Sequence, residues 1–381
     1  MPADAAPRTA PLLAALLGLA LVGCGGGGKG TGGPATGCQD LDGDGFTTCD
    51  GDCCDVAGPG CPDPASVNPG AFDVPGNGVD DDCNGAADDA PAACDAALAS
   101  DSSRALDYAA AIDLCQTTTD PGVRWGVLSA GLVLADGTGA PDAAQASIRT
   151  AFGATGSLSG SALVVLSTGH AAATGQANPP FAAFQPGFVV GTSSPAPADW
   201  LAANGGAMPA APGCPAPSGT AVNDPVMLVL RIRVPTNARS FELPIRYLTS
   251  DYPEWACSPF TDRAVVLLDS SWTGSPANPG DKNLAVYRTP GGLDYPLDVN
   301  LASGNTGLFT ACVNGNLGCA MGATPGTTNT CAEIASLSGT GLDGSDPGNC
   351  DAGSLVGGGT GWLAVRGNVV GGEVITLRIG L

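Results

Sequence analysis

The stretch CQDLDGDGFTTCDGDCCD, residues 38–55, constrains the fold of this chain more than any other stretch. Six of its eighteen residues are Asp and four are Cys, and residues 38–89 contain no Lys or Arg. Carboxylates this close repel one another by roughly 3 kcal/mol per pair when the effective dielectric constant is about 20. Either surrounding water or a bound cation must therefore balance the charge.

The order of the acids favours calcium. Three of them alternate with other residues, as ligands 1, 3 and 5 of a calcium loop do, and these are Asp40, Asp42 and Asp44. Gly45 then lies where the loop turns sharply, and the Phe46 carbonyl lies at ligand position 7. Position 12 of an EF-hand needs Glu but is Gly51 here, so later acids are expected to complete the shell. The candidates are Asp50, Asp52 and Asp55.

A second group of acids follows in PGNGVDDDCNGAADD. Its candidate ligands are Asp80, Asp81, Asp82 and Asn84. Cysteines lie between the acids throughout residues 38–89, and few residues there are apolar. We therefore expect a small module that is folded by disulfides and by Ca²⁺, since hard oxygen donors suit this ion. The alternatives are another metal ion or a solvated acidic loop.

Residues 38–89 also resemble a bacterial metal-binding repeat that is named after a copper-binding surface protein of methanotrophs. The matching pieces are DLDGDGF (40–46), GDCCD (51–55), NPGA (68–71) and NGVDDDCNG (77–85). The family name suggests copper, but the segment has no His and no Met. Two positions depart from the repeat, because Cys54 is extra and Asp73 lies where Glu is usual. The resemblance implies metal binding, and the ligand chemistry favours Ca²⁺.

Residues 1–23 are expected to be a lipoprotein signal peptide. An apolar run at 10–23, too short for a comfortable membrane span, ends in LVGC, which resembles a bacterial lipobox. Cys24 would carry the lipid anchor, and the Gly-rich segment 24–37 would be a flexible tether. No Asp follows Cys24, which favours the outer membrane or the cell surface of a Gram-negative bacterium. The alternative is an ordinary secretory signal followed by a disulfide cysteine.

Charge and cysteine content limit the partners. The formal net charge is −22, and Lys29 and Lys282 are the only lysines in the sequence. Nucleic acid and anionic lipid are therefore expected to be poor direct partners, and the membrane is expected to be reached through the lipid anchor. The fifteen cysteines indicate disulfides and an oxidising compartment outside the cytoplasm.

Residues 90–381 are expected to form one large domain. Short helices are predicted at 104–116 and 141–152. Apolar and polar residues alternate with period two in 226–235 and 240–248. Further strands are predicted at 263–271, 283–289, 360–370 and 372–379. Many short strands separated by turns predict a mainly β fold, an antiparallel β-sandwich of the jelly-roll or lectin-like type.

This domain resembles the choice-of-anchor L domain, especially its myxobacterial versions. The matching pieces include AAAIDLC (109–115), GVLSAGLVLADG (126–137), ALVVLSTG (162–169), 223–268 and 358–379. The family implies a surface-anchored β-sandwich for adhesion or matrix, without catalysis. Its members continue into further strands, so the resemblance also implies that C-terminal strands are missing after Leu381.

The segment around Cys257 offers a candidate ligand loop, made of Asp251, Tyr252, Glu254, Trp255 and Asp262. We expect a non-catalytic domain that binds a surface polymer, a glycan or a protein. The chain has one His, His170, and lacks the G-x-S-x-G and phosphate-loop motifs. The alternative hypotheses are a secreted glycan hydrolase that uses Glu254 and Asp262, and a surface scavenger of copper.

Overall fold

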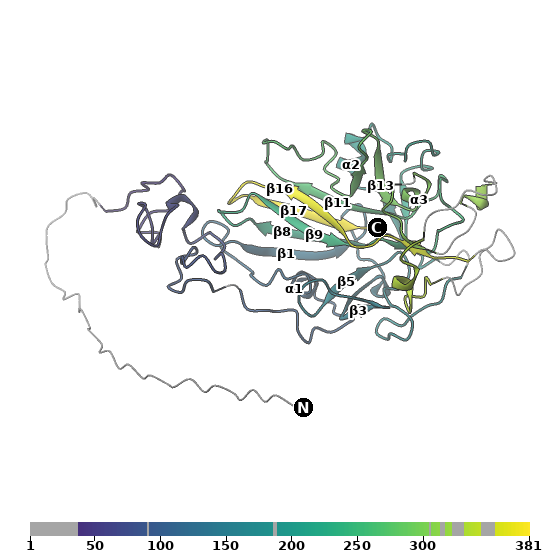
Figure 1. Ribbon diagram of the computed structural model, residues 1–381, viewed down its shortest axis with the longest axis horizontal. Coiled ribbons are helices and arrows are strands. Elements are labelled where there is room, and N and C mark those ends of the chain that lie inside the picture. The colour runs from purple at the N-terminus through teal and green to yellow at the C-terminus, as the bar shows by residue number, and fades with distance from the viewer. Residues whose placement is uncertain are drawn as a thin grey trace, which may run out of the picture. The chain divides into compact units, whose positions relative to one another are not determined.

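The structure is a computed structural model that describes residues 37–89, 91–185, 189–304, 306–312, 317–321, 331–343 and 355–381. The fold is mainly β, with antiparallel strands and a few short helices, which confirms the expected fold class (Figure 1). The chain from Gln39 to Leu381 forms one compact unit. The expected signal peptide 1–23, the lipid site Cys24 and the tether up to residue 36 lie outside the described residues.

The largest sheet has six strands in the order β1-β8-β17-β11-β13-β12. Their bounds are β1 (Gly126–Val133), β8 (Met227–Arg233), β17 (Val374–Gly380), β11 (Arg263–Asp269), β13 (Asp294–Asp298) and β12 (Val286–Arg288). All neighbouring strands are antiparallel. Side chains alternate between the two faces of a strand. Val266 and Leu268 of β11 accordingly pack in the main core, while Val265 and Leu267 pack on the opposite face.

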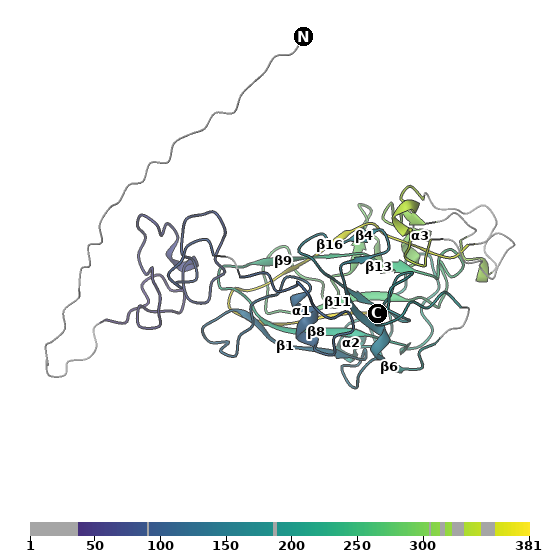
Figure 2. The same ribbon diagram turned by 90° about the horizontal axis from the view of Figure 1, so that it is seen from below.

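A second layer covers the main-core face. It consists of β9 (Ser240–Ile245) paired with β16 (Leu363–Asn368), and of β2 (Ala146–Arg149) paired with β5 (Leu163–Leu166). Figure 2 shows β9 and β16 on the side opposite β1 and β8. A Cβ atom at Gly367 of β16 would lie 2.9 Å from the Leu268 side chain of β11, so the layers are in close contact. This arrangement is a β-sandwich with an apolar core between its layers.

The outer face of the large sheet is covered by α2 (Ala198–Ala203). Trp200 of this helix is buried and packs with Met227 and Leu267. Within the described ranges, no helix has the length and apolar character that are needed to cross a bilayer.

The remaining elements are short. The helices are α1 (Ala105–Ala110), α3 (Asn300–Ser303), and the 3₁₀ turns η1 (Pro64–Ser66), η2 (Ala143–Gln145), η3 (Cys319–Met321) and η4 (Ile334–Leu337). A three-stranded sheet joins β10 (Leu248–Thr249), β15 (Gly358–Gly359) and β14 (Ala311–Cys312). Two further pairs are β3 (Ala151–Phe152) with β4 (Thr155–Gly156), and β6 (Ser193–Pro195) with β7 (Ala221–Asn223).

The prediction of a helix at 141–152 is wrong. Asp142 and Gln145 form a capping box, but it opens only the single turn η2, after which the chain extends into β2 and β3. Ile148 is β-branched and pairs with Val164 of β5 in the core. Pairing in the sheet therefore overrides a local helix-start signal. The helix predicted at 104–116 forms only as α1, whereas the six predicted strands all form, as β8, β9, β11, β12, β16 and β17.

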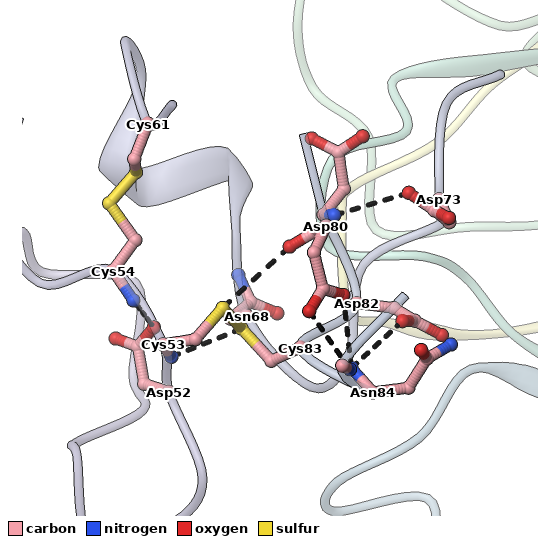
Figure 3. Close-up of a disulfide and its surroundings, with 12 residues drawn as sticks. Asp52, Cys53, Cys54, Cys61, Asn68, Asp73, Asp80, Asp82, Cys83 and Asn84 are labelled. Atoms are coloured by element: carbon pink, nitrogen blue, oxygen red, sulfur yellow. Dashed lines mark hydrogen bonds between the residues drawn. A yellow bond between two sulfur atoms is a disulfide. The ribbon is translucent and has the colours of Figure 1, made fainter. Parts of the chain in front are cut away.

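Residues 37–89 contain one 3₁₀ turn, η1, and no strand. Regular secondary structure therefore contributes little to this acidic segment, and disulfides cross-link it. Cys53 pairs with Cys83 and Cys54 pairs with Cys61 (Figure 3). A very small apolar cluster surrounds them, formed by Cys54, Val67 and Val79. Elsewhere the disulfides include Cys94–Cys115, Cys214–Cys257 and Cys312–Cys331. Every cysteine in the described ranges is disulfide-bonded, which confirms the expected disulfides.

Candidate metal centre

The loop from Asp40 to Phe46 is curled by hydrogen bonds from its own backbone. Asp40 accepts hydrogen bonds from the N–H groups of Gly43 and Gly45, at 2.6 and 3.1 Å. Asp44 accepts one from the Phe46 N–H at 2.8 Å. Gly43 and Gly45 have φ angles of +81° and +96°, which glycine adopts without the strain that a Cβ would cause. The glycines therefore allow a tight loop in which alternate carboxylates face one region.

Five carboxylates from this loop and the turn that follows it converge, and they are Asp40, Asp42, Asp44, Asp52 and Asp55. Oxygen atoms of Asp40, Asp42 and Asp55 lie within 4.8 Å of one another, as do those of Asp42, Asp44 and Asp52. Ligands on opposite sides of a Ca²⁺ ion are about 5 Å apart, because each Ca–O distance is about 2.3–2.6 Å. Since Asp42 belongs to both groups, the five acids form one continuous cluster with the spacing of a calcium site.

Two buried oxygen atoms in this cluster have no hydrogen-bond partner, Asp42 Oδ2 and Asp52 Oδ2. Asp52 is only 5% exposed, and its other oxygen accepts a hydrogen bond from the Cys54 N–H at 2.9 Å. Leaving a buried polar group without a partner costs about 1–3 kcal/mol, and more for a charged group. A cation among the acids would satisfy both oxygens.

The same crowding disfavours ionisation of the acids. Burial is the largest cause, and it raises the pKa of Asp42 and Asp52 and raises the pKa of Asp44 to about 6. Neighbouring carboxylates raise each pKa further, whereas backbone N–H donors partly oppose the change. A bound dication reverses this balance because it favours the ionised form of every carboxylate around it.

Two of the predicted ligands have other contacts. Asp50 accepts hydrogen bonds from the N–H and hydroxyl of Thr47, at 3.2 and 2.6 Å, and so closes the turn after the loop. It is not among the converging acids of the described residues. The Phe46 side chain is buried, and its ring lies against Gly70, where an added Cβ would come within 3.1 Å. The Phe46 carbonyl stays a predicted ligand.

The second predicted group forms a hydrogen-bonded turn. Asp80 accepts hydrogen bonds from the N–H groups of Asn84 and Gly85, and Asp82 also accepts one from the Asn84 N–H (Figure 3). Asp81 is buried and accepts hydrogen bonds from the Val74 N–H and from the Asn77 side chain. In the described parts of the chain, no three acids of this turn converge as those of the first loop do. The structure therefore separates Asp80, Asp81, Asp82 and Asn84 from the five-acid cluster.

Asp73, for which the sequence suggested no contact, lies at the centre of this second turn. It is 2% exposed and accepts hydrogen bonds from the backbone N–H groups of Asp81 and Asp89, at 3.2 and 2.5 Å. Burial raises the pKa of Asp73 in spite of these two donors. Asp73 therefore provides the acceptor for two backbone N–H groups of this turn.

Asn68 joins the acid cluster to the β-sandwich. It is fully buried, and its side-chain amide donates a hydrogen bond to Asp44 Oδ2 at 2.8 Å. Its carbonyl oxygen accepts hydrogen bonds from the Gly70 N–H and from the hydroxyl of Thr236, which follows β8. The Thr236 N–H also donates to the Gly70 carbonyl. The sequence showed NPGA only as a piece of the metal-binding repeat, and the contact with the β-sandwich appears only in the structure.

The same segment makes a second contact with the sandwich. Phe72 and Asn237 exchange two hydrogen bonds, at 3.0 and 2.8 Å, and the Phe72 ring packs against Trp125 with centroids 5.6 Å apart. A Cβ atom at Gly70 would lie 3.0 Å from the Thr236 side chain and 3.0 Å from the Val123 carbonyl, so a larger residue would require these neighbours to shift. Residues 68–72 therefore form a docking segment between the acidic loop and the turn after β8.

The candidate ligand loop is divided by the fold. Tyr252 and Glu254 are 0% and 1% exposed, so neither side chain lies at the surface, while Trp255 is half-buried. Asp262 lines a cavity of about 260 Å³, and its N–H donates a hydrogen bond to Asp251 at 3.3 Å. The structure thus brings Asp251 and Asp262 together, but Glu254 is not among the residues that line this cavity.

Comparison of the chain with protein-family models, with curated proteins and with solved structures gives no match.

Proposed function

We propose that this protein is a calcium-binding, lipid-anchored surface protein in which Ca²⁺ folds the acidic segment and fixes it to the β-sandwich. The observation that carries this proposal is Asp52. Its carboxylate is buried in a cluster of like charge, and one of its oxygens has no donor. A carboxylate in that position is disfavoured unless a cation lies beside it.

The donor set supports Ca²⁺ over copper. The converging groups are all carboxylates, whereas copper prefers imidazole, thiolate or thioether ligands. His and Met are absent from residues 38–89, and the cysteines there are oxidised. Extracellular calcium modules bind with dissociation constants of roughly 10⁻⁴ to 10⁻³ M. Such an affinity suits a structural ion outside the cell, where calcium is plentiful.

The proposed role of the β-sandwich is to bind a surface polymer, a glycan or another protein without catalysis. Support comes from the mainly β fold and from the position of Glu254, which is buried away from the cavity that Asp262 lines. That separation gives no support to a glycan hydrolase built on these two acids. Attachment through lipid at Cys24 rests on the LVGC sequence alone.

Calorimetric titration of Ca²⁺ into an oxidised chain of residues 37–381, stripped with EDTA, tests the metal site. We expect saturable binding of at least one ion that Cu²⁺ does not displace at equal concentration. Asp52→Asn should weaken binding at least ~10-fold, because it removes one charged ligand from a site of few ligands.

Asp50→Asn is the matched control, because this acid belongs to the same segment but bonds to Thr47 instead of facing the cluster. It should leave the affinity for Ca²⁺ unchanged. Absence of Ca²⁺ binding by the unmodified chain, or equal losses in the two variants, would contradict the proposed site.

A further inference from the structure

A second group of carboxylates lies beside a cavity of about 260 Å³ on the outer face of the large sheet, whose lining includes Asp262 and Arg263. The cavity is bordered by α2, by β7 and by the segment that leads into β11. Its walls are mostly apolar and include Trp200, Met208, Val222, Met227 and Val265. Asp262 supplies a carboxylate to this lining, and Asp262 Oδ2 accepts a hydrogen bond from the Thr168 hydroxyl at 3.1 Å.

Carboxylates outnumber cations around Asp262. The charged and titratable groups that act on it or on its neighbours are Asp224, Asp251, Asp298, Tyr247 and Arg263. Arg263 is paired with Asp298, with a nitrogen–oxygen distance of 2.7 Å, and both side chains are buried. Asp224 is held by three backbone N–H donors. Neither Asp251 nor Asp262 forms an ion pair within the described residues.

We propose that this cavity binds a small organic cation, an ammonium group carried on a short apolar body. The ammonium group would lie against Asp262, with Asp251 behind it, and the apolar body would contact the walls. Trp200 places an indole ring in one wall, and aromatic rings attract cations as well as apolar groups.

A metal ion fits this cavity less well than an organic cation. Calcium needs several oxygen atoms that converge within about 5 Å. Among the residues described, acids converge in this way only in the acidic loop. A neutral ligand would leave the Asp262 charge without a counter-ion, whereas an ammonium group provides one. The size of the cavity suits a body of a few carbon atoms, and its apolar walls exclude a strongly hydrated ion.

Calorimetry with choline and with its neutral isostere 3,3-dimethylbutan-1-ol tests the proposal on residues 37–381 at pH 8 in saturating Ca²⁺. The two compounds have the same shape and differ in charge. We expect saturable binding of choline, with the neutral compound at least ~10-fold weaker. Affinity for choline should fall between pH 8 and pH 6, because burial raises the pKa of Asp262 and raises that of Asp251 to about 7.

Two variants act on the cavity in different ways. Asp262→Asn removes the charge and should weaken choline binding at least ~10-fold, whereas Asp101→Asn, at an exposed position, should not. Ala221→Trp places a large ring at an exposed residue that lines the cavity and should block binding without changing charge. Asp52→Asn should leave choline binding intact, which separates this site from the metal centre.

The proposal is overturned if the unmodified chain does not bind choline at millimolar concentration, or if the neutral isostere binds equally well. It is also overturned if choline binding persists in both Asp262→Asn and Ala221→Trp.

Discussion

Replacing Asp52 by Asn should stabilise the calcium-free protein and should reduce the stability that the protein gains from calcium. In the absence of the ion, Asp52 repels Asp42 and Asp44, whose oxygens lie within 4.8 Å of its own. One such pair costs about 3 kcal/mol at an effective dielectric constant of about 20, and solvent around the half-buried partners lowers this. Asn keeps the oxygen that accepts from the Cys54 N–H and offers an amide donor to the cluster. The calcium-free variant should therefore be more stable by about 1–3 kcal/mol.

Calcium should reduce this difference, because the unmodified protein gains more stability from the ion than the variant does. A ligand that binds only the folded state stabilises it by RT ln(1 + [L]/Kd), which is about 2.7 kcal/mol when the ligand is at 100 times Kd. With a Kd of about 10⁻⁴ M, 10 mM Ca²⁺ gives the unmodified protein this full gain. If Asn weakens binding by 10-fold to 100-fold, the variant gains only about 0.4–1.4 kcal/mol. The difference in calcium-dependent gain is the quantity to measure.

Urea unfolding with the disulfides intact, in EDTA and in 10 mM Ca²⁺, gives both gains. Asp50→Asn is the control, because Asp50 closes the turn at Thr47 and does not face the cluster, so its calcium-dependent gain should equal that of the unmodified chain. An Asp52→Asn variant that gains as much from Ca²⁺ as the unmodified protein would refute the assignment of Asp52 as a ligand.

Two further changes test the docking segment and the buried acids. Asn68→Ala removes the buried side chain that joins Asp44 to Thr236, so unfolding in Ca²⁺ should become easier by about 2–3 kcal/mol, whereas Asn84→Ala, at an exposed residue, should change it little. Burial and the charge of Asp262 raise the pKa of Asp251 to about 7 from 3.8, so the folded state binds more protons than the unfolded state between these values. Stability should therefore fall as the pH rises from about 4 to 7, and Asp251→Asn should flatten this dependence in urea titrations at pH 5 and pH 8. Equal slopes in the two proteins would show that Asp251 is not the group responsible.

Much of the fold follows from local patterns in the sequence. The strands β8, β9, β16 and β17 form where apolar and polar residues alternate, because each has one face in the main core. β11 is instead a continuous apolar run, because both of its faces are buried. The segment 141–152 shows where such patterns stop being sufficient. Its capping box is a real local signal, but Ile148 is needed in the sheet opposite Val164, and this partner is not visible in the local sequence.

The candidate metal centre divides in a similar way. The spacing of Asp40, Asp42 and Asp44 could be recognised because all three belong to one short loop. The sequence could not show which of the later acids joins the cluster, since Asp50 and Asp52 both follow the loop within a few residues. The structure distinguishes them, because Asp50 accepts a hydrogen bond from the Thr47 hydroxyl whereas Asp52 lies beside Asp42 and Asp44.

The docking segment connects the proposed metal site to the β-sandwich. Asn68 can bond Asp44 and Thr236 together only while the acidic loop keeps the shape that a bound ion would stabilise. A bound calcium ion would therefore favour the same conformation of residues 40–72 as the β-sandwich does. By linkage, an ion that strengthens the docking contact must itself be bound more tightly when that contact is made. In the proposed site, one bound ion would therefore stabilise both the folding of a segment with almost no core and its attachment to the β-sandwich.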